Sequence, residues 1–384
     1  MLEVANGLEF ERDLAGDNTL RLPCTASRFW RARSDADVID GLRQANEQEW
    51  PLTVLGGGSN LLLPPRLHGL VLAPDIEGVS FTPQQGDLVE VVAGAAMRWH
   101  ALVIACVERG LWGIENLALI PGWVGAAPIQ NIGAYGVELA DVLSWVELVD
   151  RRDARCYRLT RDECRLGYRD SIFKGELANQ VVITRVCLAL SRHPAPRLDY
   201  GVLNERVTAP LTPGAVVDAV CAIRREKLPD PRELPNAGSF FKNPVVSRAK
   251  AERLAAESPA MPRYPQADDH VKLAAGWLID QCDLKGWRQG AFGVHHQQAL
   301  VLVHFGGGSL DELLAFAAGI VERVSTRFGV ALEREPRLID EQALSQHGAV
   351  DHRAAKPEPK PGESGGGVAS GDAFSLPGSA RPER

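Results

Sequence analysis

Hydrophobic and polar positions along the chain follow two different periods. Apolar residues recur near helical spacing over 34–47 and more clearly over 309–327, where Asp311 and Glu312 stand in the first turn. Alternating or β-branched runs at 142–149 and 181–190 favour strands instead. The pattern therefore predicts a globular protein in which helices and strands are mixed along the chain.

The same reading assigns several further elements. Residues 70–110 form a β-rich segment that ends in a helix over 99–108. The apolar spacing of 271–282 is that of an amphipathic helix, and 299–304 reads as a strand. Proline-bounded residues 224–235 indicate a domain boundary. From about residue 346 the chain is rich in Pro, Gly, Ser and charge, which predicts a disordered tail.

One stretch, 113–138, breaks both periods. It carries no charge between Glu115 and Glu138, and its length alone would suit a membrane span. Pro121, Pro128 and several glycines deny it helical continuity, so we expect irregular backbone packed inside the protein. Its amides, Asn116, Gln130 and Asn131, then need hydrogen-bond partners. A bulky, flat, partly polar ligand such as a dinucleotide would explain the stretch, and a tightly packed glycine-rich turn is the alternative.

A second glycine-rich segment, 56–60, follows the strand predicted at 52–55. It is not the GxGxxG turn of a Rossmann fold, because an apolar strand at 61–63 follows it where that fold needs a helix. It is not a P-loop either, since no Lys-Ser/Thr pair follows. What remains is a strand–glycine–strand turn whose backbone N–H groups could cradle a pyrophosphate. A plain tight turn would fit the same residues.

Two polar residues stand out elsewhere. Arg169 lies in CRLGYRDSIFK, 164–174, where its neighbours suit either a surface charge or a partly buried anion binder. Ser239 lies in NAGSFFKNP, 236–244, between a glycine and two phenylalanines. No G-x-S-x-G elbow surrounds it, which argues against a hydrolase serine.

The composition and charge of the chain limit the kinds of partner and the location that we expect for the protein. The net charge of -7 argues against a nucleic-acid surface. No apolar leader or transmembrane-length window is present, so we expect no membrane insertion. Seven scattered cysteines without a CxxC pair indicate reduced thiols in a cytoplasm. His295, His296 and His304 lack partners at ligand spacing, so we expect no metal site.

Six motifs together resemble one family, the UDP-N-acetylenolpyruvoylglucosamine reductases. They occur in the family's order between about residues 15 and 340, so the set is far more specific than any single motif. The motifs are LGGGSN (55–60), ENLALIPGWVGAAPIQNIGAYGVEL (115–139), GYRDSIFK (167–174), EKLPDP (226–231), NAGSFFKNPVV (236–246) and LERE (332–335).

The resemblance implies an α+β architecture. It predicts a two-lobed FAD-binding domain of the vanillyl-alcohol-oxidase (PCMH) type over 15–226, with lobes at about 15–75 and 76–226. A substrate-binding domain would follow over 227–343, and then the disordered tail, 344–384. The implied reaction is NADPH-dependent reduction, through non-covalent FAD, of UDP-N-acetylglucosamine enolpyruvate to UDP-N-acetylmuramate for peptidoglycan synthesis. We expect a cytoplasmic monomer whose partners are the nucleotide-sugar and NADPH.

The resemblance also assigns roles to residues. Arg169 would stabilise charge developing toward the substrate carboxylate, Glu335 would bind and polarise that group, and Ser239 would donate a proton to carbon. The substrate contacts carried over are Tyr200, in the segment 196–203, with Lys227, Asn243 and Gln298. The cofactor contacts are Gly56, Gly57, Gly58, Ser59, Asn60, Gly122, Gly125, Gln130, Asn131 and Gly133.

Three features depart from the family pattern. Trp123 stands where a small residue often follows the Pro-Gly pair, and the ending EREPR places its proline after Glu335. The chain beyond residue 345 has no counterpart in the family. Two other functions stay open at this point: an FAD oxidase of the same fold, and a non-enzymatic binder of nucleotide-sugars.

Overall fold

The first strands of the chain form a four-stranded mixed sheet. The computed structural model describes residues 7–340, and all of them belong to one unit, Met1–Gly348. In this sheet the first two strands are antiparallel and the other neighbours are parallel. Its order is β1 (Leu8–Asp13), β2 (Thr25–Ala32), β5 (Arg66–Pro74) and β3 (Leu52–Val54).

Helix α1 (Asp35–Glu47) packs on this sheet through an apolar stripe that includes Val38 and Leu42. The Ser34 hydroxyl accepts a hydrogen bond from the Asp37 N–H and caps the helix. The helix predicted over 34–47 is therefore confirmed.

A five-stranded antiparallel sheet follows. The strands predicted at 142–149 and 181–190 are confirmed as neighbours in it, with Val146 opposite Val186. Helices α2 (Trp99–Val107), α3 (Leu203–Arg206) and α4 (Pro213–Lys227) contribute to the core beside it. The sheet order is β11 (Cys156–Thr160), β10 (Leu143–Asp150), β12 (Val181–Ser191), β7 (Leu88–Gly94) and β6 (Val79–Pro83).

The stretch 113–138 is irregular and packed inside, as predicted. It forms short pieces only: the 3₁₀ turns η2 (Glu115–Leu117) and η3 (Val124–Gln130), then β8 (Gly133–Ala134) and β9 (Val137–Glu138), with η4 (Leu139–Asp141) after them. Asn116 is fully buried, and its amide donates to the carbonyl oxygens of Tyr135 and Arg197, both at 2.8 Å. The backbone of the stretch is thus held by side-chain hydrogen bonds where no ladder is available.

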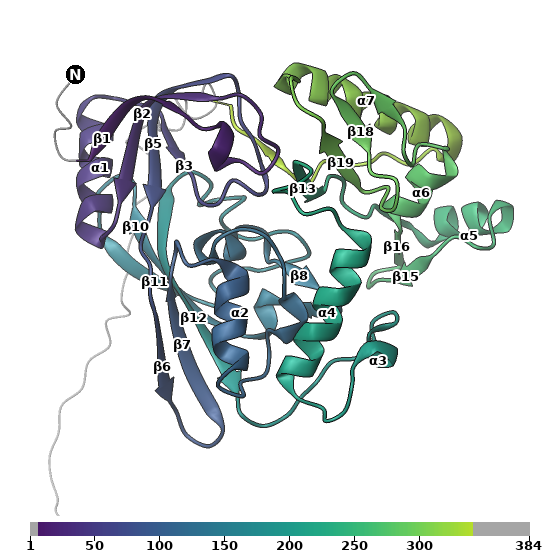
Figure 1. Cartoon of the computed structure of the whole chain (residues 1–384), viewed down its shortest axis with the longest axis horizontal. Helices are drawn as coiled ribbons and strands as arrows, with labels where there is room; N and C mark the ends of the chain where they lie inside the picture. Colours follow the sequence, from purple (N-terminus) through teal and green to yellow (C-terminus); the bar gives the residue numbers. More distant parts are fainter. Residues whose placement is uncertain (1–6, 341–384) are drawn as a thin grey trace, which may run out of the picture. The chain divides into compact units, whose positions relative to one another are not determined.

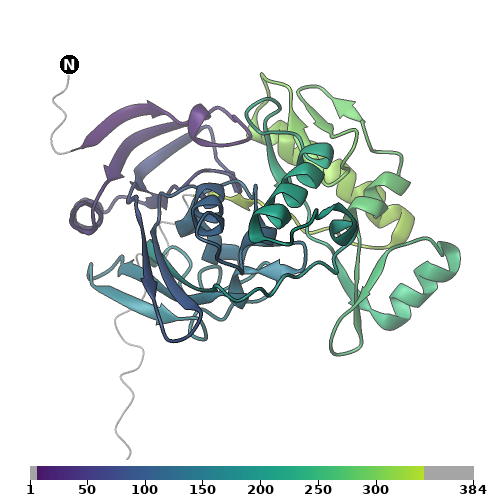
Figure 2. The same ribbon diagram turned by 60° about the horizontal axis from the view of Figure 1, so that its bottom comes forward.

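The C-terminal part holds another four-stranded antiparallel sheet, covered by the long helix α7 (Leu310–Phe328). Ser309 and Glu312 form a capping box at the start of α7, in agreement with the predicted helix. Figures 1 and 2 show α4 between α2 and the elements of this part. The strand order is β13 (Asn236–Ser239), β19 (Val301–His304), β18 (Phe292–Val294) and β17 (Arg288–Gln289).

The amphipathic helix predicted over 271–282 is wrong in its first third. Residues 270–273 form β16 (His270–Leu273), between β14 (Val245–Ser247) and β15 (Arg263–Pro265), and α5 (Arg248–Glu257) packs beside them. Only α6 (Ala275–Gln281) is helical. Val271 and Leu273 alternate with more exposed residues and are buried on one face of β16, so the strand accounts for their apolar character without a helix.

The last strand of the described residues pairs with a strand from the N-terminal part of the chain. Strand β20 (Arg337–Leu338) pairs in parallel with β4 (Leu61–Leu62), directly after the glycine turn. The division predicted at 226/227 falls at the last residue of α4 and stays a prediction. The predicted tail, 344–384, lies outside the described residues. Within 7–340, no helix combines the length and apolar character needed to cross a bilayer.

Candidate active site

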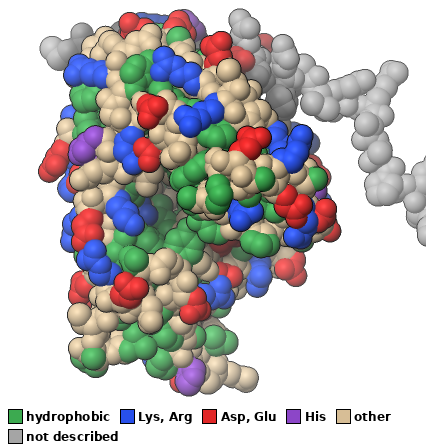
Figure 3. All heavy atoms as spheres, turned by 90° about the vertical axis from the view of Figure 1, so that its right-hand side faces the viewer, with side chains coloured by type: hydrophobic (Ala, Val, Ile, Leu, Met, Phe, Trp, Pro, Cys, Tyr) green, Lys and Arg blue, Asp and Glu red, His purple; other side chains and the backbone are tan. Residues whose placement is uncertain are grey.

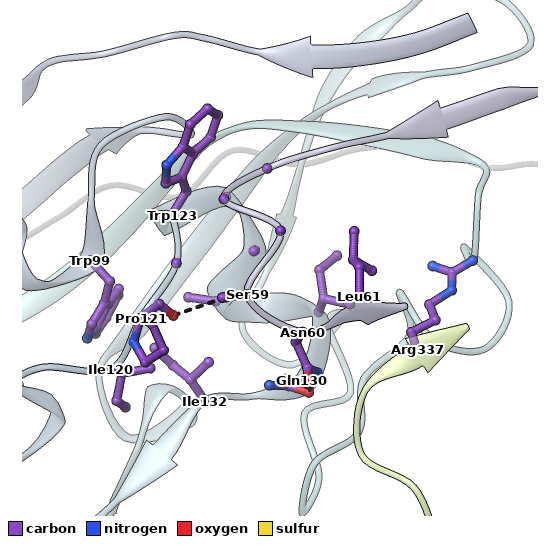
Figure 4. A pocket seen from close by; sticks show the side chains of 18 of the residues that line it. Ser59, Asn60, Leu61, Trp99, Ile120, Pro121, Trp123, Gln130, Ile132 and Arg337 are labelled. Carbon is purple, nitrogen blue, oxygen red and sulfur yellow. Dashed lines mark hydrogen bonds between the residues drawn. The ribbon is translucent and has the colours of Figure 1, made fainter. Parts of the chain in front are cut away.

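A cavity of about 320 Å³ lies between the glycine turn, the central stretch and the segments 237–239 and 335–339. Figure 4 shows part of its lining, with the turn before Ser59 on one side and the 120–132 segment on the other. Figure 3 shows a hollow on one face of the molecule, with hydrophobic and Lys or Arg side chains at its rim. Such surroundings suit a ligand with both apolar and anionic parts.

The backbone N–H groups of the glycine turn are available to a ligand. The N–H groups of residues 56–60 donate to no other described residue. Gly58 has φ +58°, and a Cβ there would lie 2.0 Å from the Asp17 carbonyl oxygen. A side chain is therefore excluded at Gly58. Consecutive free N–H groups in a turn form a concave anion site, which is the arrangement a diphosphate needs.

The central stretch packs directly against this turn. The Ser59 hydroxyl donates to the Pro121 carbonyl oxygen at 3.2 Å (Figure 4). Gly122 has φ +114°, and its Cβ would lie 2.7 Å from the Ser59 Oγ. The Asn60 amide donates to the Gln130 Oε1 and so links the turn to the end of η3. The two glycine-rich segments noted in the sequence thus form adjoining walls of one cavity.

Most of the predicted cofactor contacts line this cavity, and Asn131 does not. Asn131 is fully buried; its amide donates to the Glu138 Oε2 and the Gly167 carbonyl oxygen, and its Oδ1 accepts from the Ala140 N–H. Its hydrogen bond to Gly167 holds the loop that carries Arg169. The lining residues among those predicted are Gly56, Gly57, Gly58, Ser59, Asn60, Gly122, Gly125, Gln130 and Gly133.

The three predicted catalytic residues, Arg169, Ser239 and Glu335, also line the cavity. The Arg169 Nε lies 3.1 Å from the Glu335 Oε1, and an Nη2 of Arg169 donates to the Gly133 carbonyl oxygen at 2.9 Å. Arg169 itself has φ +54°, a left-handed conformation that turns its side chain inward from a tight loop.

Glu335 is strongly desolvated, with 11% of its side chain exposed. Burial raises its pKa, and the nearby cations Arg169, Lys174 and Lys242 oppose that rise without reversing it. The carboxyl group therefore holds a proton more readily than an ordinary glutamate does.

Main-chain pairing explains why Glu335 and Ser239 line the same cavity. The Glu335 N–H donates to the Phe240 carbonyl oxygen at 2.9 Å, and Phe241 forms an isolated bridge with Arg334. Phe240 is fully buried, and its N–H donates to the Leu300 carbonyl oxygen at 2.7 Å. The hydroxyl group of Ser239 makes no hydrogen bond to another described residue.

The predicted substrate residues divide into two groups. Asn243 and Gln298 line a second, more open cavity of about 270 Å³, together with Tyr264, Trp277 and Lys285. The Asn243 Oδ1 accepts from the Ala275 N–H at 2.9 Å and thereby caps α6. Tyr200 and Lys227 line neither cavity.

Tyr200 and Lys227 occupy more exposed positions. Tyr200 is 53% exposed and meets Tyr135 edge to face at 5.9 Å between ring centres. Lys227 is the last residue of α4.

Sequence reasoning missed three cations of the cavity wall, Lys174, Arg224 and Arg337. The Arg337 Nη2 donates to the Asn179 Oδ1, and burial lowers the pKa of Arg337. The Lys174 Nζ donates to the Arg169 carbonyl oxygen at 2.9 Å, and burial is the main cause that lowers the pKa of Lys174. The Nε of Arg224 is buried without a partner among the described residues, and burial lowers the pKa of Arg224. Helical spacing from the buried Val217, Val220 and Cys221 was the available signal for Arg224.

The departures from the family pattern leave the cavity in place. Trp123 lies in its wall, with the indole against Gly57. Pro336 follows Glu335, and the Arg334 Nε donates to its carbonyl oxygen at 3.1 Å. Glu335 still reaches the cavity, because its own N–H remains in the pairing with Phe240.

Of the three histidines considered as metal ligands, His304 has two structural partners. His304 is buried; its Nδ1 lies 2.8 Å from the Leu20 carbonyl oxygen, and its Nε2 accepts from the Gly308 N–H. Among residues 7–340, no group of three or more His, Cys, Asp or Glu side chains is arranged to hold a metal ion.

Comparison with known proteins identifies related chains. Residues 230–339 match the C-terminal domain of UDP-N-acetylenolpyruvoylglucosamine reductase, and residues 26–160 match the FAD binding domain family. The UDP-N-acetylenolpyruvoylglucosamine reductase of Pseudomonas aeruginosa is 50% identical over 325 residues, which cover 84% of this chain and 96% of that protein. The Pseudomonas putida protein of the same name is 46% identical over the same shares.

A solved structure shares the fold. The crystal structure of UDP-N-acetylenolpyruvylglucosamine reductase from Thermus caldophilus covers 86% of this chain and 97% of its own, with a TM-score of 0.58 and 24% identity. At that identity the match speaks for the fold alone. The sequence matches show more than the fold, because their identities are 46% and 50% and they cover 96% of each relative. This chain belongs to the UDP-N-acetylenolpyruvoylglucosamine reductase family.

Proposed function

We propose that this protein is a flavoenzyme that uses NADPH to reduce the enolpyruvyl group of UDP-N-acetylglucosamine enolpyruvate, yielding UDP-N-acetylmuramate for peptidoglycan synthesis. The observation that carries the proposal is the meeting, in one cavity, of Ser239, the Arg169–Glu335 pair and the glycine turn. The relatives that match the chain over most of its length carry the name of this reductase.

The cavity suits FAD. Five consecutive free N–H groups at 56–60 provide an anion cradle for its diphosphate, and Gly122 and Gly125 leave room for close approach. Gln130 and Gly133 would contact the cofactor further along the wall. When bound, FAD accepts hydride from NADPH and supplies hydride to the substrate.

The Arg169–Glu335 pair would hold the substrate carboxylate. As hydride reaches the terminal carbon of the enolpyruvyl group, negative charge moves toward that carboxylate. A fixed guanidinium stabilises this charge most strongly in a site with little water. Glu335 is suited to the same task because its raised pKa allows its carboxyl group to donate a hydrogen bond to the substrate.

Ser239 would complete the reduction by giving a proton to the carbon that becomes the lactyl centre. Hydride and proton together add two electrons and two hydrogens across the double bond, so the product is the lactyl ether. The Ser239 hydroxyl has no hydrogen-bond partner among the described residues and is free to turn toward a ligand. A serine is a weak acid, so its contribution rests on position beside the developing carbanion.

The nucleotide-sugar would extend from this cavity toward the second one. Asn243 and Gln298 offer amides there, and Lys285 offers a cation to an anionic ligand. Tyr200 and Lys227 would contact the ligand from the intervening surface. We also propose that the FAD-binding domain ends at residue 226, that the enzyme is a monomer and that it acts in the cytoplasm.

An absorption experiment tests the proposal. The purified protein should be yellow, should bleach with NADPH in the absence of oxygen, and should regain its colour when the enolpyruvyl nucleotide-sugar is added. A colourless protein that binds the nucleotide-sugar would point to a binder without enzymatic activity. Rapid oxygen consumption with a small alcohol would point to an oxidase of the same fold.

A further inference from the structure

Trp123 is the large aromatic residue that borders the glycine turn. It lines the cavity, half-buried, at the start of η3. A Cβ built on Gly57 would lie 3.0 Å from the Trp123 Cδ1 and 3.3 Å from its Nε1. A Cβ built on Gly56 would lie 3.9 Å from the Trp123 Cε3, so the indole lies against both glycines, with its Nε1 nearest to Gly57. Figure 4 shows the indole beside that turn.

The indole N–H of Trp123 donates to no other described residue, and its Nε1 is not among the buried unpaired atoms of the described residues, so this donor is accessible from the cavity. Trp99, in the same cavity wall, shows the contrast: its Nε1–H donates to the Leu117 carbonyl oxygen at 3.0 Å. The Trp99 ring thus has a structural hydrogen bond, whereas the Trp123 donor is left for a ligand.

The backbone around Trp123 is fixed, so the indole is presented from a rigid support. Trp123 forms an isolated bridge with Arg98, the Trp99 N–H donates to the Gly122 carbonyl oxygen at 3.0 Å, and the Ala126 N–H donates to the Trp123 carbonyl oxygen at 3.0 Å. A backbone held in place before the ligand arrives loses little conformational freedom on binding, and the ring itself is placed by its contact with Gly57.

We propose that the indole N–H of Trp123 extends the cradle of the glycine turn and donates a hydrogen bond to the diphosphate of the bound cofactor. This inference rests on the proposed function, because FAD is the ligand with a diphosphate. The indole Nε1 beside Gly57 would then add one donor to the five backbone N–H groups at 56–60. The alternative is that the ring serves only as an apolar wall.

The rate at which the holoprotein releases FAD separates the two. Trp123→Phe keeps an aromatic ring and removes the donor, and Trp123→Ser removes both. Trp50→Phe is the matched control, since Trp50 is also half-buried but lies outside the cavity, beneath Arg28. Release is followed as the rise of free flavin fluorescence after dilution of the holoprotein.

We expect Trp123→Phe to release FAD about tenfold faster than the unmodified protein, as for loss of one hydrogen bond to a charged group. Trp50→Phe should release it at the unmodified rate. If Trp123→Phe matches the unmodified protein while Trp123→Ser is faster, the ring acts as a wall and the donor is overturned. If both Trp123 variants match the unmodified protein, the residue has no part in holding FAD.

A spectroscopic measurement gives a second readout, which is interpreted together with the release rates of Trp123→Phe and Trp123→Ser. With ¹⁵N-labelled indoles, the chain should give eight Nε1–H signals, one for each tryptophan, and the one lost in Trp123→Phe belongs to Trp123. In the holoprotein this signal should exchange with solvent more slowly than that of Trp50. Equally fast exchange would overturn the inference. A purified protein without any flavin would instead end the proposed function, so the two failures are distinguishable.

Discussion

Replacing Ser239 by alanine should separate the two halves of the reaction. Reduction of the flavin by NADPH needs no proton on a substrate carbon, whereas reduction of the enolpyruvyl group needs both hydride and proton. General acid catalysis typically contributes about 10²–10⁴-fold. The Ser239→Ala enzyme should therefore bleach normally with NADPH and regain its colour with substrate at least about 100-fold more slowly.

The structure indicates that this loss would not come from unfolding. The hydroxyl has no hydrogen-bond partner among the described residues, so its removal leaves no buried group unpaired. Ser239 pairs with Val301 through its backbone, which alanine preserves, and it does not have a positive φ. The free energy of unfolding should change by no more than about 0.5 kcal/mol.

Rapid-mixing absorbance follows each half-reaction by itself. Ser80→Ala, on the exposed face of β6, is a matched control and should leave both phases unchanged. Ser239→Cys should recover part of the second phase, because a thiol also donates a proton. Equal slowing of both phases by Ser239→Ala, or a change in substrate affinity alone, would refute the assignment of Ser239 as proton donor.

Three further predictions address the cavity. Gly122→Ala should destabilise the protein by about 2–4 kcal/mol in urea unfolding and lower its flavin content, because Gly122 has φ +114° and its Cβ would lie 2.7 Å from the Ser59 Oγ. The control Gly319→Ala, in open space within α7, should instead stabilise the protein by about 0.5–1 kcal/mol. Similar effects of the two substitutions would contradict this geometry. Burial raises the pKa of Glu335 above its ordinary 4.5, so the stability that this group contributes is fully present below pH 4.5 and is lost as pH rises through the folded-state pKa. The free energy of unfolding of Glu335→Gln should therefore increase relative to that of the unmodified protein from pH 5 to pH 8. A constant difference between the two proteins would show that the pKa is not raised. Acid or heat should free yellow FAD, and colour retained by the denatured protein would reveal a covalent link.

The local pattern predicted much of the fold because several elements are encoded locally. The helix α7 has apolar spacing, a capping serine and acidic residues in its first turn, all within its own sequence. The region 270–273 is different: its residues form a strand by pairing with 263–265 across a short hairpin and with Val245, which is distant in sequence. Strand formation of that kind depends on partners that a window of sequence does not contain.

The candidate site was predicted from motifs, and the prediction was wrong for Asn131, whose side-chain direction is set by local backbone geometry. Gln130 and Asn131 are adjacent amides in one motif, yet only Gln130 lines the cavity. Asn131 ends η3 with φ +45°, and this left-handed turn directs its side chain into the protein toward Glu138 and Gly167. Nothing in the residue types themselves distinguishes the two roles.

The direction of Ser239 follows from a similar irregularity in β13. Asn236 stands opposite Val303 and Ser239 opposite Val301, so three steps on one strand span two on the other. Gly238 lies within this shift and has φ +69°, as a bulge requires. Side chains of a regular strand alternate between its faces, and one extra residue reverses the alternation. Without the extra residue Asn236 and Ser239, three apart, would point to opposite faces; with it, both stand opposite residues two apart on β19 and share one face of β13. On that face the Asn236 amide donates to the Pro229 and Leu234 carbonyl oxygens, and Ser239 lines the cavity. The glycine before Ser239 thus has a role in aiming the hydroxyl, and the motif NAGS specifies a backbone geometry as much as a reactive group.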